Sequence, residues 1–419
     1  MQEEFLHYLF EYQLIENTEF EIISPGLKNN DSGPDFFNSK IRIGETVWAG
    51  NVEIHINASD WHKHGHQKDK AYDNIILHLV LKNDKDIFST KGELIPAFEI
   101  KYNSEIYKNY NSLISNSLWV HCEKELPNID TLTKISFLDK LAIDRLQRKT
   151  EFFDQLLEYN NNNWEETFFQ ALAKGFGGKV NNIPFELLSK SVSLNTILKN
   201  RGNILSIEAI LYGQSGLLED DSITDSYYSK LQNEYKFLKQ KYQLEAIRPE
   251  LWKFSKIRPY NFPTIKISLI AQLLNQYNSL FSKVIDCKTI IELETLFEIK
   301  ASEYWEEHYT FGKASKSLSK RIGKSSKHNL IINTIIPFVY VYATQTNKEE
   351  LKERCIDWLI AIPPEKNNIT KKWEERGFEN KNAMESQALI ELKNEKCSKH
   401  LCLDCRIAHK ILTLSWLNN

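Results

Sequence analysis

Short apolar runs alternate with turn residues over the first 126 residues of the chain. Runs rich in β-branched and aromatic side chains are typical of strands, and they lie at residues 20–23, 41–43, 52–56 and 75–80. Apolar side chains recur at helical spacing ahead of the first run, at Phe5, Tyr8, Leu9 and Tyr12. Polar residues 67–73 are compatible with a short helix between two strands. This order predicts an N-terminal α/β domain with a central mixed sheet.

Beyond residue 127 the apolar positions take the spacing of helices. Asp130 can cap a first long helix, and a second is expected to begin near Trp164 and to stop at the glycines of 175–178. Further apolar runs at helical spacing cover 204–212, 225–242, 265–300 and 328–362. The pattern predicts an α+β protein with domains at 1–126, 127–369 and 370–419.

Acidic residues stand at two of the predicted strands. Asp35 follows Gly33-Pro34 just before one strand, and Glu53 lies on a later strand, two residues ahead of His55. Side chains alternate along a strand, so Glu53 and His55 share one face. Converging carboxylates can hold Mg²⁺ or Mn²⁺ against a scissile phosphate, where the ion activates the attacking water. Asp35, Glu53 and His55 are therefore the candidate catalytic residues, with Asp35 and Glu53 as metal ligands.

Pro34-Asp35 followed by Glu53-Ile54-His55 resembles the signature of the PD-(D/E)XK nuclease superfamily. The flanking order of helix, strands, short helix and apolar strand is also similar. This resemblance implies a nuclease-like fold, a metal-dependent site and a nucleic-acid substrate. His55 stands where the superfamily has Lys, which orients water or stabilises the transition state. A protonated His can take that role, whereas a neutral His can bind the metal.

Histidines are concentrated in the same part of the chain, at His55, His62, His64, His66 and His78. Imidazoles, with the carboxylates of Asp60, Asp69 and Asp73 among them, suit Zn, Mn or Fe. If 62–66 were a strand, three imidazoles would share one face, as in a cupin-like metal enzyme on an antiparallel barrel. Gly65 and its polar neighbours instead favour a loop entering a helix, whose histidines either line a cleft over Asp35 and Glu53 or are simply solvated.

The C-terminal segment carries the strongest local motif, Cys397-x4-Cys402-x2-Cys405-x3-His409. A structural Zn²⁺ takes four thiolate or imidazole ligands, and the x2 spacing lets one turn supply two thiolates. The spacing therefore predicts a metal knuckle that binds zinc. The alternatives are an iron–sulfur cluster with Cys355 or Cys122 as fourth thiolate, His400 as a ligand, or buried free thiols.

Basic residues cluster without an intervening acid in the stretch 312–327. They are Lys313, Lys316, Lys320, Arg321, Lys324 and Lys327. On a helix the five lysines would fall on one face, which suits contacts with DNA or RNA phosphates, and serines of the same stretch add donors. The opposing interpretation is a solvated surface.

Composition narrows the class of protein. The 419 residues are 42% hydrophobic and 26% charged, which is typical of a folded globular chain. Lys and Arg total 53 against 56 Asp and Glu, so the net charge of −3 excludes a globally basic nucleic-acid binder but not a local basic patch. The N-terminus lacks a signal-peptide pattern, and the most apolar stretch, 330–343, is too short to cross a membrane. We therefore expect a cytoplasmic protein.

Several motifs together resemble a bacterial family catalogued as domain of unknown function 2851. They lie at 33–38, 50–55, 59–61, 64–66, 71–78, 258–264, 331–334 and 386–388, with the three C-terminal cysteines. The resemblance covers nearly the whole chain, and it implies no activity because the family name records none.

Three functions are compatible with these patterns. The first is a Mg²⁺- or Mn²⁺-dependent nuclease that cleaves phosphodiester bonds of DNA or RNA. The second, favoured by His55 in place of Lys, is a non-enzymatic nucleic-acid-binding or scaffold protein on a degenerate nuclease fold. The third is a cupin-like metal enzyme. Carboxylates of Asp35 and Glu53 within reach of one ion would support the first function, and histidines converging inside a barrel would support the third.

Overall fold

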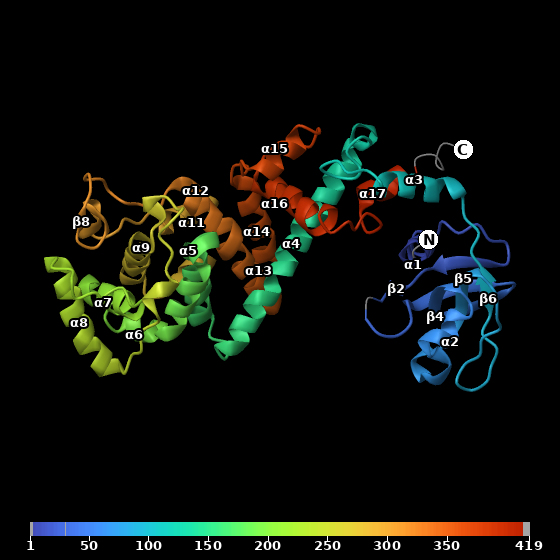
Figure 1. Cartoon of the computed structure of the whole chain (residues 1–419), viewed down its shortest axis with the longest axis horizontal. Helices are drawn as coiled ribbons and strands as arrows, with labels where there is room; N and C mark the ends of the chain where they lie inside the picture. The colour runs from blue at the N-terminus through green and yellow to red at the C-terminus, as the bar shows by residue number, and fades with distance from the viewer. Residues whose placement is uncertain (1–2, 30, 414–419) are drawn as a thin grey trace. The chain divides into compact units, whose positions relative to one another are not determined.

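A computed structural model describes residues 3–29 and 31–413 (Figure 1). The chain divides into two compact units. Unit 1 comprises Met1–Leu138, Lys372–Phe378 and Ile390–Asn419. Unit 2 comprises Asp139–Lys371 and Glu379–Leu389. Most of the C-terminal segment, which the sequence analysis assigns to a third domain, therefore belongs to the same unit as the N-terminal part.

Unit 1 is built on a mixed β-sheet that follows helix α1 (Glu3–Glu11), drawn in blue in Figure 1. Its strands are β1 (Phe20–Ser24), β2 (Leu27–Lys28), β3 (Phe36–Ile43), β4 (Thr46–Asn57), β5 (Ile75–Lys82) and β6 (Ala97–Glu99). Their order is β1-β3-β4-β5-β6, with β2 paired to β3. The β1–β3 and β3–β4 pairs are antiparallel, and the β4–β5 and β5–β6 pairs are parallel. The prediction of a mixed sheet in the N-terminal part is confirmed.

Strand β4 presents different chemistry on its two faces because its side chains alternate. Val52 and Ile54 are fully buried in a core that α1 completes through Phe5 and Leu6. Glu53 and the residues that share its face lie on the opposite side of the sheet. The register is fixed by a tight β3–β4 turn, where Gly44 has φ 59° and Ile43 pairs with Thr46.

The connection from β4 to the parallel strand β5 covers the polar face of the sheet. It consists of helix α2 (Asp60–His64) and two 3₁₀ turns, η1 (His66–Lys68) and η2 (Lys70–Tyr72). Gly65 ends α2 in the left-handed conformation, with φ 82°. Trp61 and Tyr72 anchor the connection in a small apolar cluster with Ile75. The predicted short helix at 67–73 is thus replaced by 3₁₀ turns, and the α-helix begins earlier.

The remaining elements of unit 1 come from both ends of the sequence. They are α3 (Ser104–Ile114), η3 (Leu126–Asn128), the start of α4 (Thr131–Tyr159), the end of α15 (Asn368–Glu374), the end of α16 (Ala383–Glu391), the π-helical turn η8 (Leu392–Cys397) and α17 (Arg406–Thr413). Helix α17 packs on α3, and its Leu412 is buried in the same core as Phe5 of α1.

Unit 2 is mainly helical, as predicted for the region after residue 127. Besides the rest of α4, α15 and α16, its longer helices are α5 (Trp164–Ser191), α7 (Ile204–Gln214), α8 (Ser226–Tyr242), α9 (Pro263–Gln276), α12 (Lys324–Leu330), α13 (Ile336–Gln345) and α14 (Glu349–Ala361). Its short elements are α6 (Leu194–Leu198), η4 (Pro249–Leu251), η5 (Pro259–Asn261), α10 (Leu280–Asp286), α11 (Ile290–Leu296), η6 (Glu303–Glu306), β7 (His308–Thr310), β8 (Lys313–Ala314) and η7 (Ile331–Ile335).

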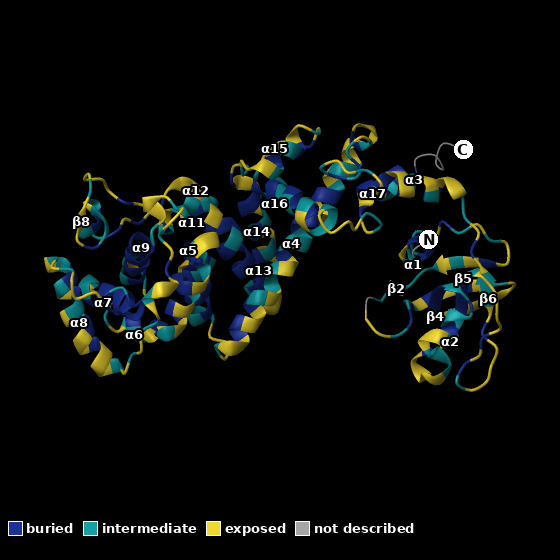
Figure 2. Ribbon diagram, viewed as in Figure 1, coloured by how far each residue is buried: buried dark blue, intermediate teal, exposed yellow. Residues whose placement is uncertain are grey.

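The centre of unit 2 is formed by helices that are buried on every side. Nearly every residue of α7 and of the first three turns of α9 is buried, and both helices appear dark blue in Figure 2. A helix without an exposed face is enclosed by others, so α7 and α9 are core elements. Of the helices described, none is long and apolar enough to span a bilayer.

Candidate functional site

Two carboxylates meet at the edge where β3 begins beside β4. The backbone N–H of Ile54 donates to Asp35 Oδ2 over 2.8 Å, and the backbone N–H of Asp35 donates to Glu53 Oε2 over 3.1 Å. Each carboxylate thus accepts a backbone N–H at or next to the other acidic residue, because Ile54 follows Glu53 in β4 and Asp35 donates from just before β3. The antiparallel β3–β4 pair therefore brings Asp35 and Glu53 together, as the spacing of the sequence motif predicts.

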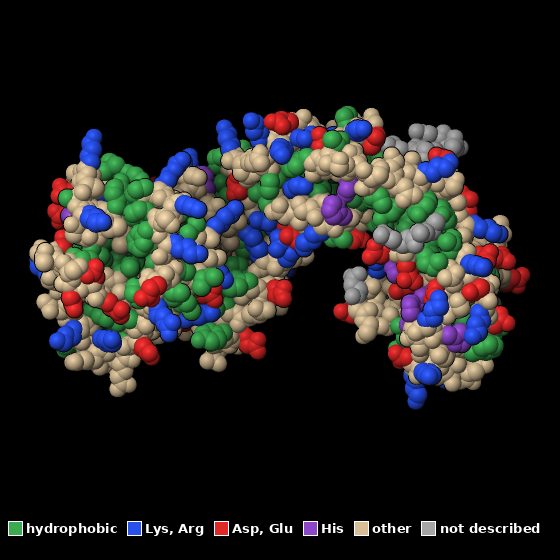
Figure 3. Space-filling model, viewed as in Figure 1, with side chains coloured by type: hydrophobic (Ala, Val, Ile, Leu, Met, Phe, Trp, Pro, Cys, Tyr) green, Lys and Arg blue, Asp and Glu red, His purple; other side chains and the backbone are tan. Residues whose placement is uncertain are grey.

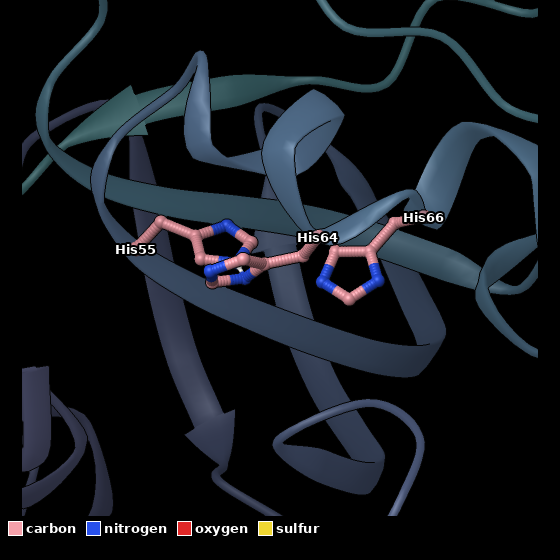
Figure 4. A group of neighbouring side chains, drawn as sticks. All are labelled: His55, His64 and His66. Carbon is pink, nitrogen blue, oxygen red and sulfur yellow. Dashed lines mark hydrogen bonds between the residues drawn. The ribbon is translucent and has the colours of Figure 1, made fainter.

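The imidazoles of His55 and His66 lie beside the Glu53 carboxylate, and Figure 4 shows these two rings together with that of His64. One ligand atom from each of the three lies within 4.8 Å of the others. His55 Nε2 and His66 Nε2 lie 3.5 Å and 3.2 Å from Glu53 Oε1, and His55 Nε2 is 3.0 Å from His64 Nδ1. Strand β4, helix α2 and the turn η1 each contribute one imidazole to this cluster.

Further side chains orient the three imidazoles. His55 Nδ1 shares a hydrogen bond with His78 Nε2 of β5 over 2.8 Å, which leaves His55 Nε2 directed at Glu53 and His64. The His66 ring stacks on Tyr72, with ring centroids 3.9 Å apart. Such contacts from a surrounding layer fix the tautomer and orientation of metal-binding histidines.

Helix α1 adds a charged residue to the site that the sequence pattern did not single out. His7 Nε2 lies 3.2 Å from Asp35 Oδ2. Burial opposes a charge on this ring, but the adjacent carboxylate of Asp35, helped by Glu3, raises the pKa of His7. His7 is therefore the imidazole of this site that favours the protonated form. A lone histidine on an amphipathic helix carries no sequence signal of such a role.

Burial sets the charge state of the other groups. Burial and the neighbouring imidazoles of His78, His64 and His66 hold the pKa of His55 far below its ordinary value, and burial lowers the pKa of His78 to about 4. Burial and the charge of Asp35 raise the pKa of Glu53 well above that of a free glutamate. Neutral imidazoles and a buried carboxyl group are groups that a divalent metal can bind, provided that it displaces the proton of the carboxyl group.

The donor set fits a transition metal. Buried His66 Nε2 has no hydrogen-bond partner among the described residues, although it faces Glu53 Oε1. Three imidazole nitrogens with one or two carboxylates suit Mn²⁺, Fe²⁺ or Zn²⁺, whereas Mg²⁺ prefers ligands that are all oxygen. The residues that could hold the ion are Asp35, Glu53, His55, His64 and His66. We call this group the histidine–carboxylate site.

Not every polar residue near the motif joins this site. His62 of α2 lies outside the group of three imidazoles. Asp69 caps the turn η2 by accepting the N–H of Ala71, and Asp73 accepts hydrogen bonds from the N–H and the hydroxyl of Thr90. These two acids therefore have local structural partners.

A family model for proteins described as "Protein of unknown function (DUF2851)" matches residues 3–368. The chain belongs to the DUF2851 family. No curated protein and no solved structure matches it. The matched range includes the whole histidine–carboxylate site and most of unit 2, and it ends before Cys397.

The C-terminal cysteines of this DUF2851 chain have a neighbour that is distant in sequence. His121 Nε2 and His400 Nδ1 share a hydrogen bond of 2.6 Å, and Lys393 Nζ donates to the carbonyl of Trp119 over 2.9 Å. These bonds hold the segment that carries Cys122 against the C-terminal one. The pKa of Cys397 is raised by burial and by the charges of Cys405, Cys122 and Cys402, so its thiol lies within electrostatic range of all three.

His409 is directed away from these thiols and toward α1. Its Nδ1 shares a hydrogen bond of 2.9 Å with the hydroxyl of Tyr8, and its ring stacks on Tyr12 with centroids 4.1 Å apart. Cys355, the other thiol considered from the sequence, lies in the core of unit 2. Cys122 therefore replaces His409 as the candidate fourth ligand, although among the described residues no three of these thiols lie within 4.8 Å of one another.

The basic stretch in unit 2 does not form the predicted helical face. Lys313 belongs to β8, and α12 begins only at Lys324. Lys320 is buried and donates to the carbonyl of Glu306 over 2.6 Å. Lys327 is also buried, with Nζ donating to the carbonyl of Glu294 and 3.5 Å from the carboxylate of Glu298. The prediction of a single basic stripe is wrong, because Lys320 and Lys327 are buried and bonded to backbone carbonyls. The other four basic residues of the stretch are exposed: Lys313, Lys316, Arg321 and Lys324.

Proposed function

We propose that this DUF2851 protein is a metal-dependent nuclease that hydrolyses phosphodiester bonds of DNA or RNA at the histidine–carboxylate site. The observation that carries the proposal is the interlocked pair of Asp35 and Glu53, each accepting a backbone N–H at or next to the other, beside three imidazoles. Carboxylates at one edge of a sheet are what a metal-dependent phosphodiesterase requires.

The topology of unit 1 also supports the proposal. One helix, three antiparallel strands, a short helical connection and a parallel strand follow one another, as α1, β1, β3, β4, α2 and β5. This order is similar to the core of the PD-(D/E)XK superfamily, in which the acidic residues occupy the same two strands. Fold alone does not imply function, so the proposal depends on the site.

The metal expected at the site is Mn²⁺ rather than Mg²⁺, because imidazoles outnumber carboxylates among the candidate ligands. When bound, such an ion polarises a phosphate oxygen and makes an attacking water more acidic. Asp35, Glu53, His55, His64 and His66 would hold it. The lowered pKa of His55 makes this ring a ligand rather than a replacement for the cationic Lys of the nuclease signature.

The cationic role falls to His7 in this proposal. Its pKa is raised beside Asp35, so it holds a proton that it can donate to a leaving oxygen at the end of the cleavage step. Because His7 Nε2 lies beside the Asp35 carboxylate, the proton donor and the candidate metal ligands belong to the same site.

The proposal is tested with the purified full-length chain and end-labelled single-stranded DNA, duplex DNA and RNA. Cleavage of at least one polymer is expected with Mn²⁺ and none with EDTA. Absence of cleavage of all three by protein that has bound Mn²⁺ would reject the nuclease and favour the non-enzymatic nucleic-acid-binding protein. The cupin-like alternative requires an antiparallel barrel, and the described strands of unit 1 instead form a mixed sheet.

The affinity of the histidine–carboxylate site for Mn²⁺ is expected to rise about tenfold for each increase of one in pH, between roughly pH 6 and pH 8. The raised pKa of Glu53 leaves a proton on this carboxyl group in the metal-free protein, and the metal must displace it. His55, His66 and His78 have lowered pKa values, so they are already neutral in this range and add no competing proton. Calorimetric titration at several pH values measures the slope; an affinity that is independent of pH would contradict the assignment.

We propose in addition that Cys122, Cys397, Cys402 and Cys405 hold a structural Zn²⁺. Burial and the neighbouring thiols raise the pKa of Cys122 to about 12 and that of Cys402 to about 11, so the metal-free thiols are protonated and gain most from a cation. Backbone N–H groups of Ala408 and Ile407 at the start of α17 interact with the Cys405 sulfur and favour its thiolate. An iron–sulfur cluster is the alternative occupant of the same four thiols.

A further inference from the structure

A cavity of about 290 Å³ lies within unit 2, between the glycine-rich part of α5, the start of α9 and helix α12. Its lining includes Gly177 and Gly178 of α5, Lys266 of α9, and Ser325 and Ser326 of α12. The residues around it include the glycine run at which the sequence predicts the end of a helix. Neither the histidine–carboxylate site nor the cysteine site uses these residues.

Lys266 is a buried cation without a counter-charge. Its side chain lines the cavity, and the residue is only 8% exposed. Within the described chain its Nζ has no hydrogen-bond or ion-pair partner, and it lies over the ring of Phe176, 5.8 Å from the ring centroid. Burial lowers the pKa of Lys266 to about 8. An isolated buried ammonium is costly, so an anion in the cavity would stabilise it.

This environment differs from that of other buried lysines in unit 2. Lys320 and Lys327 are buried to a similar degree, and each donates to a backbone carbonyl. Lys266 alone among these three faces a cavity instead of an acceptor. Its position is therefore not explained by packing within the unit.

Glycine is needed where α5 borders the cavity. Gly178 has φ 59° and ψ −147°, a conformation that side chains oppose, and it interrupts the helix. A Cβ on Gly177 would lie 2.7 Å from the backbone nitrogen of Asn182, and one on Gly175 would lie 2.5 Å from Thr334 Oγ1. Gly175 and Gly177 thus let α5 pack closely on neighbouring parts of unit 2, whereas a Cβ on Gly178 would meet nothing within 4 Å, so the backbone is open at Gly178.

The charge around the cavity favours an anion. None of the described residues that line it is acidic, and Lys179, Asn261 and Asn329 supply a second cation and two amides. Figure 3 shows Lys and Arg side chains gathered on this face of unit 2, around the positions of α5 and α12.

We infer that the cavity binds the phosphate group of a nucleotide or of a nucleic-acid strand, with Lys266 as the buried cation and Ser325 and Ser326 as hydroxyl donors. Open backbone at Gly178, hydroxyl groups and an unpaired lysine are groups that recognise phosphate oxygens. The volume is at the lower end of the range for small-molecule sites, which suits one phosphate with its sugar rather than a dinucleotide. The inference is independent of the nuclease proposal.

The test uses the full-length chain in EDTA, so that metal at the histidine–carboxylate site does not contribute. The probes are inorganic phosphate, adenosine 5′-monophosphate and a 5′-phosphorylated single-stranded oligonucleotide, each titrated at constant ionic strength. Binding of inorganic phosphate and adenosine 5′-monophosphate identifies a nucleotide site. Binding of the oligonucleotide alone identifies a site for a nucleic-acid strand. Lys266→Met is expected to weaken binding at least about tenfold, because a charge-assisted hydrogen bond is lost.

The matched controls are Lys266→Arg, which keeps the charge, and Lys239→Met, which removes an exposed lysine of α8. Both are expected to bind the probe, the second as tightly as the wild type. Should Lys266→Met fail to fold, the pair Ser325→Ala and Ser326→Ala on the rim replaces it, and weaker binding is again expected. A wild-type chain that binds none of the probes, or a folded Lys266→Met or double-serine variant that binds them equally well, overturns the inference.

Discussion

Replacing Glu53 by glutamine is expected to abolish Mn²⁺ binding at the histidine–carboxylate site and to reduce nucleic-acid cleavage about 100- to 1000-fold. The amide keeps the shape of the side chain and can still accept the N–H of Asp35, but it supplies no charge to a metal. Because burial and Asp35 raise the pKa of Glu53, the metal-free fold holds this group as the neutral acid, whereas the unfolded chain is stabilised by its ionisation. Glu53→Gln should therefore leave the melting temperature of the metal-free protein unchanged or higher.

Two measurements separate this expectation from simple loss of structure. Calorimetry with Mn²⁺ reports the site without any substrate, and thermal unfolding in EDTA reports the fold. Glu45→Gln, an exposed carboxylate in the turn between β3 and β4, is the matched control and should alter neither. Asp35→Asn is expected to lose cleavage in the same way, because its carboxylate orients His7. A Glu53→Gln variant that binds Mn²⁺ as the wild type does would remove the metal site from consideration.

Replacing Cys122 by serine is expected to release zinc from the cysteine site and to destabilise unit 1. The zinc dissociation constant should rise by more than about 100-fold, since changes in the layer around a metal already cost 10–100-fold. Cys122 precedes the long helix α4, whereas the other three thiols lie near the C-terminus. The metal would therefore tie together segments that are far apart in sequence, and its loss should increase hydrogen exchange in both of them.

Elemental analysis of the native protein and of the variant measures this effect directly. Cys287→Ser is the matched control, because Cys287 is a buried thiol of unit 2 whose Sγ donates to the carbonyl of Lys283, a role that serine can keep. His409→Ala should retain zinc, since its ring is bonded to Tyr8 and stacked on Tyr12. Native protein that contains neither zinc nor iron, or a Cys122→Ser variant with full metal content, would refute the four-thiol site.

Local patterns were sufficient for much of unit 1. The alternation of apolar residues predicts the strands, and it also predicts that Glu53 and His55 share a face, because side-chain direction in a strand depends only on position along the chain. The turn residues ahead of β3 place Asp35 at a strand start. These are properties of neighbours in sequence, so they can be read without knowledge of contacts.

Patterns of charge and of metal ligands were less reliable. The lysines at 313–327 have helical spacing, yet Lys320 and Lys327 are buried against carbonyls of residues that precede them by more than ten positions. The spacing of Cys405 and His409 is that of metal ligands, yet the ring of His409 is taken by α1. The spacing of residues along a helix or turn shows which side chains could face one another. It does not show whether residues from distant parts of the chain bind those side chains instead.

The sequence by itself determined the α+β class, four of the described strands of the mixed sheet and the pairing of Asp35 with Glu53; the short strands β2 and β6 were missed. Only the tertiary structure decided that His7 joins this site, that the segment of Cys122 is bonded to the C-terminal segment and that Lys266 faces a cavity without a counter-charge. The physical reason is that burial, and hence the charge and the partner of a polar side chain, depends on elements that pack together from distant parts of the chain. No periodicity within a single segment contains that information.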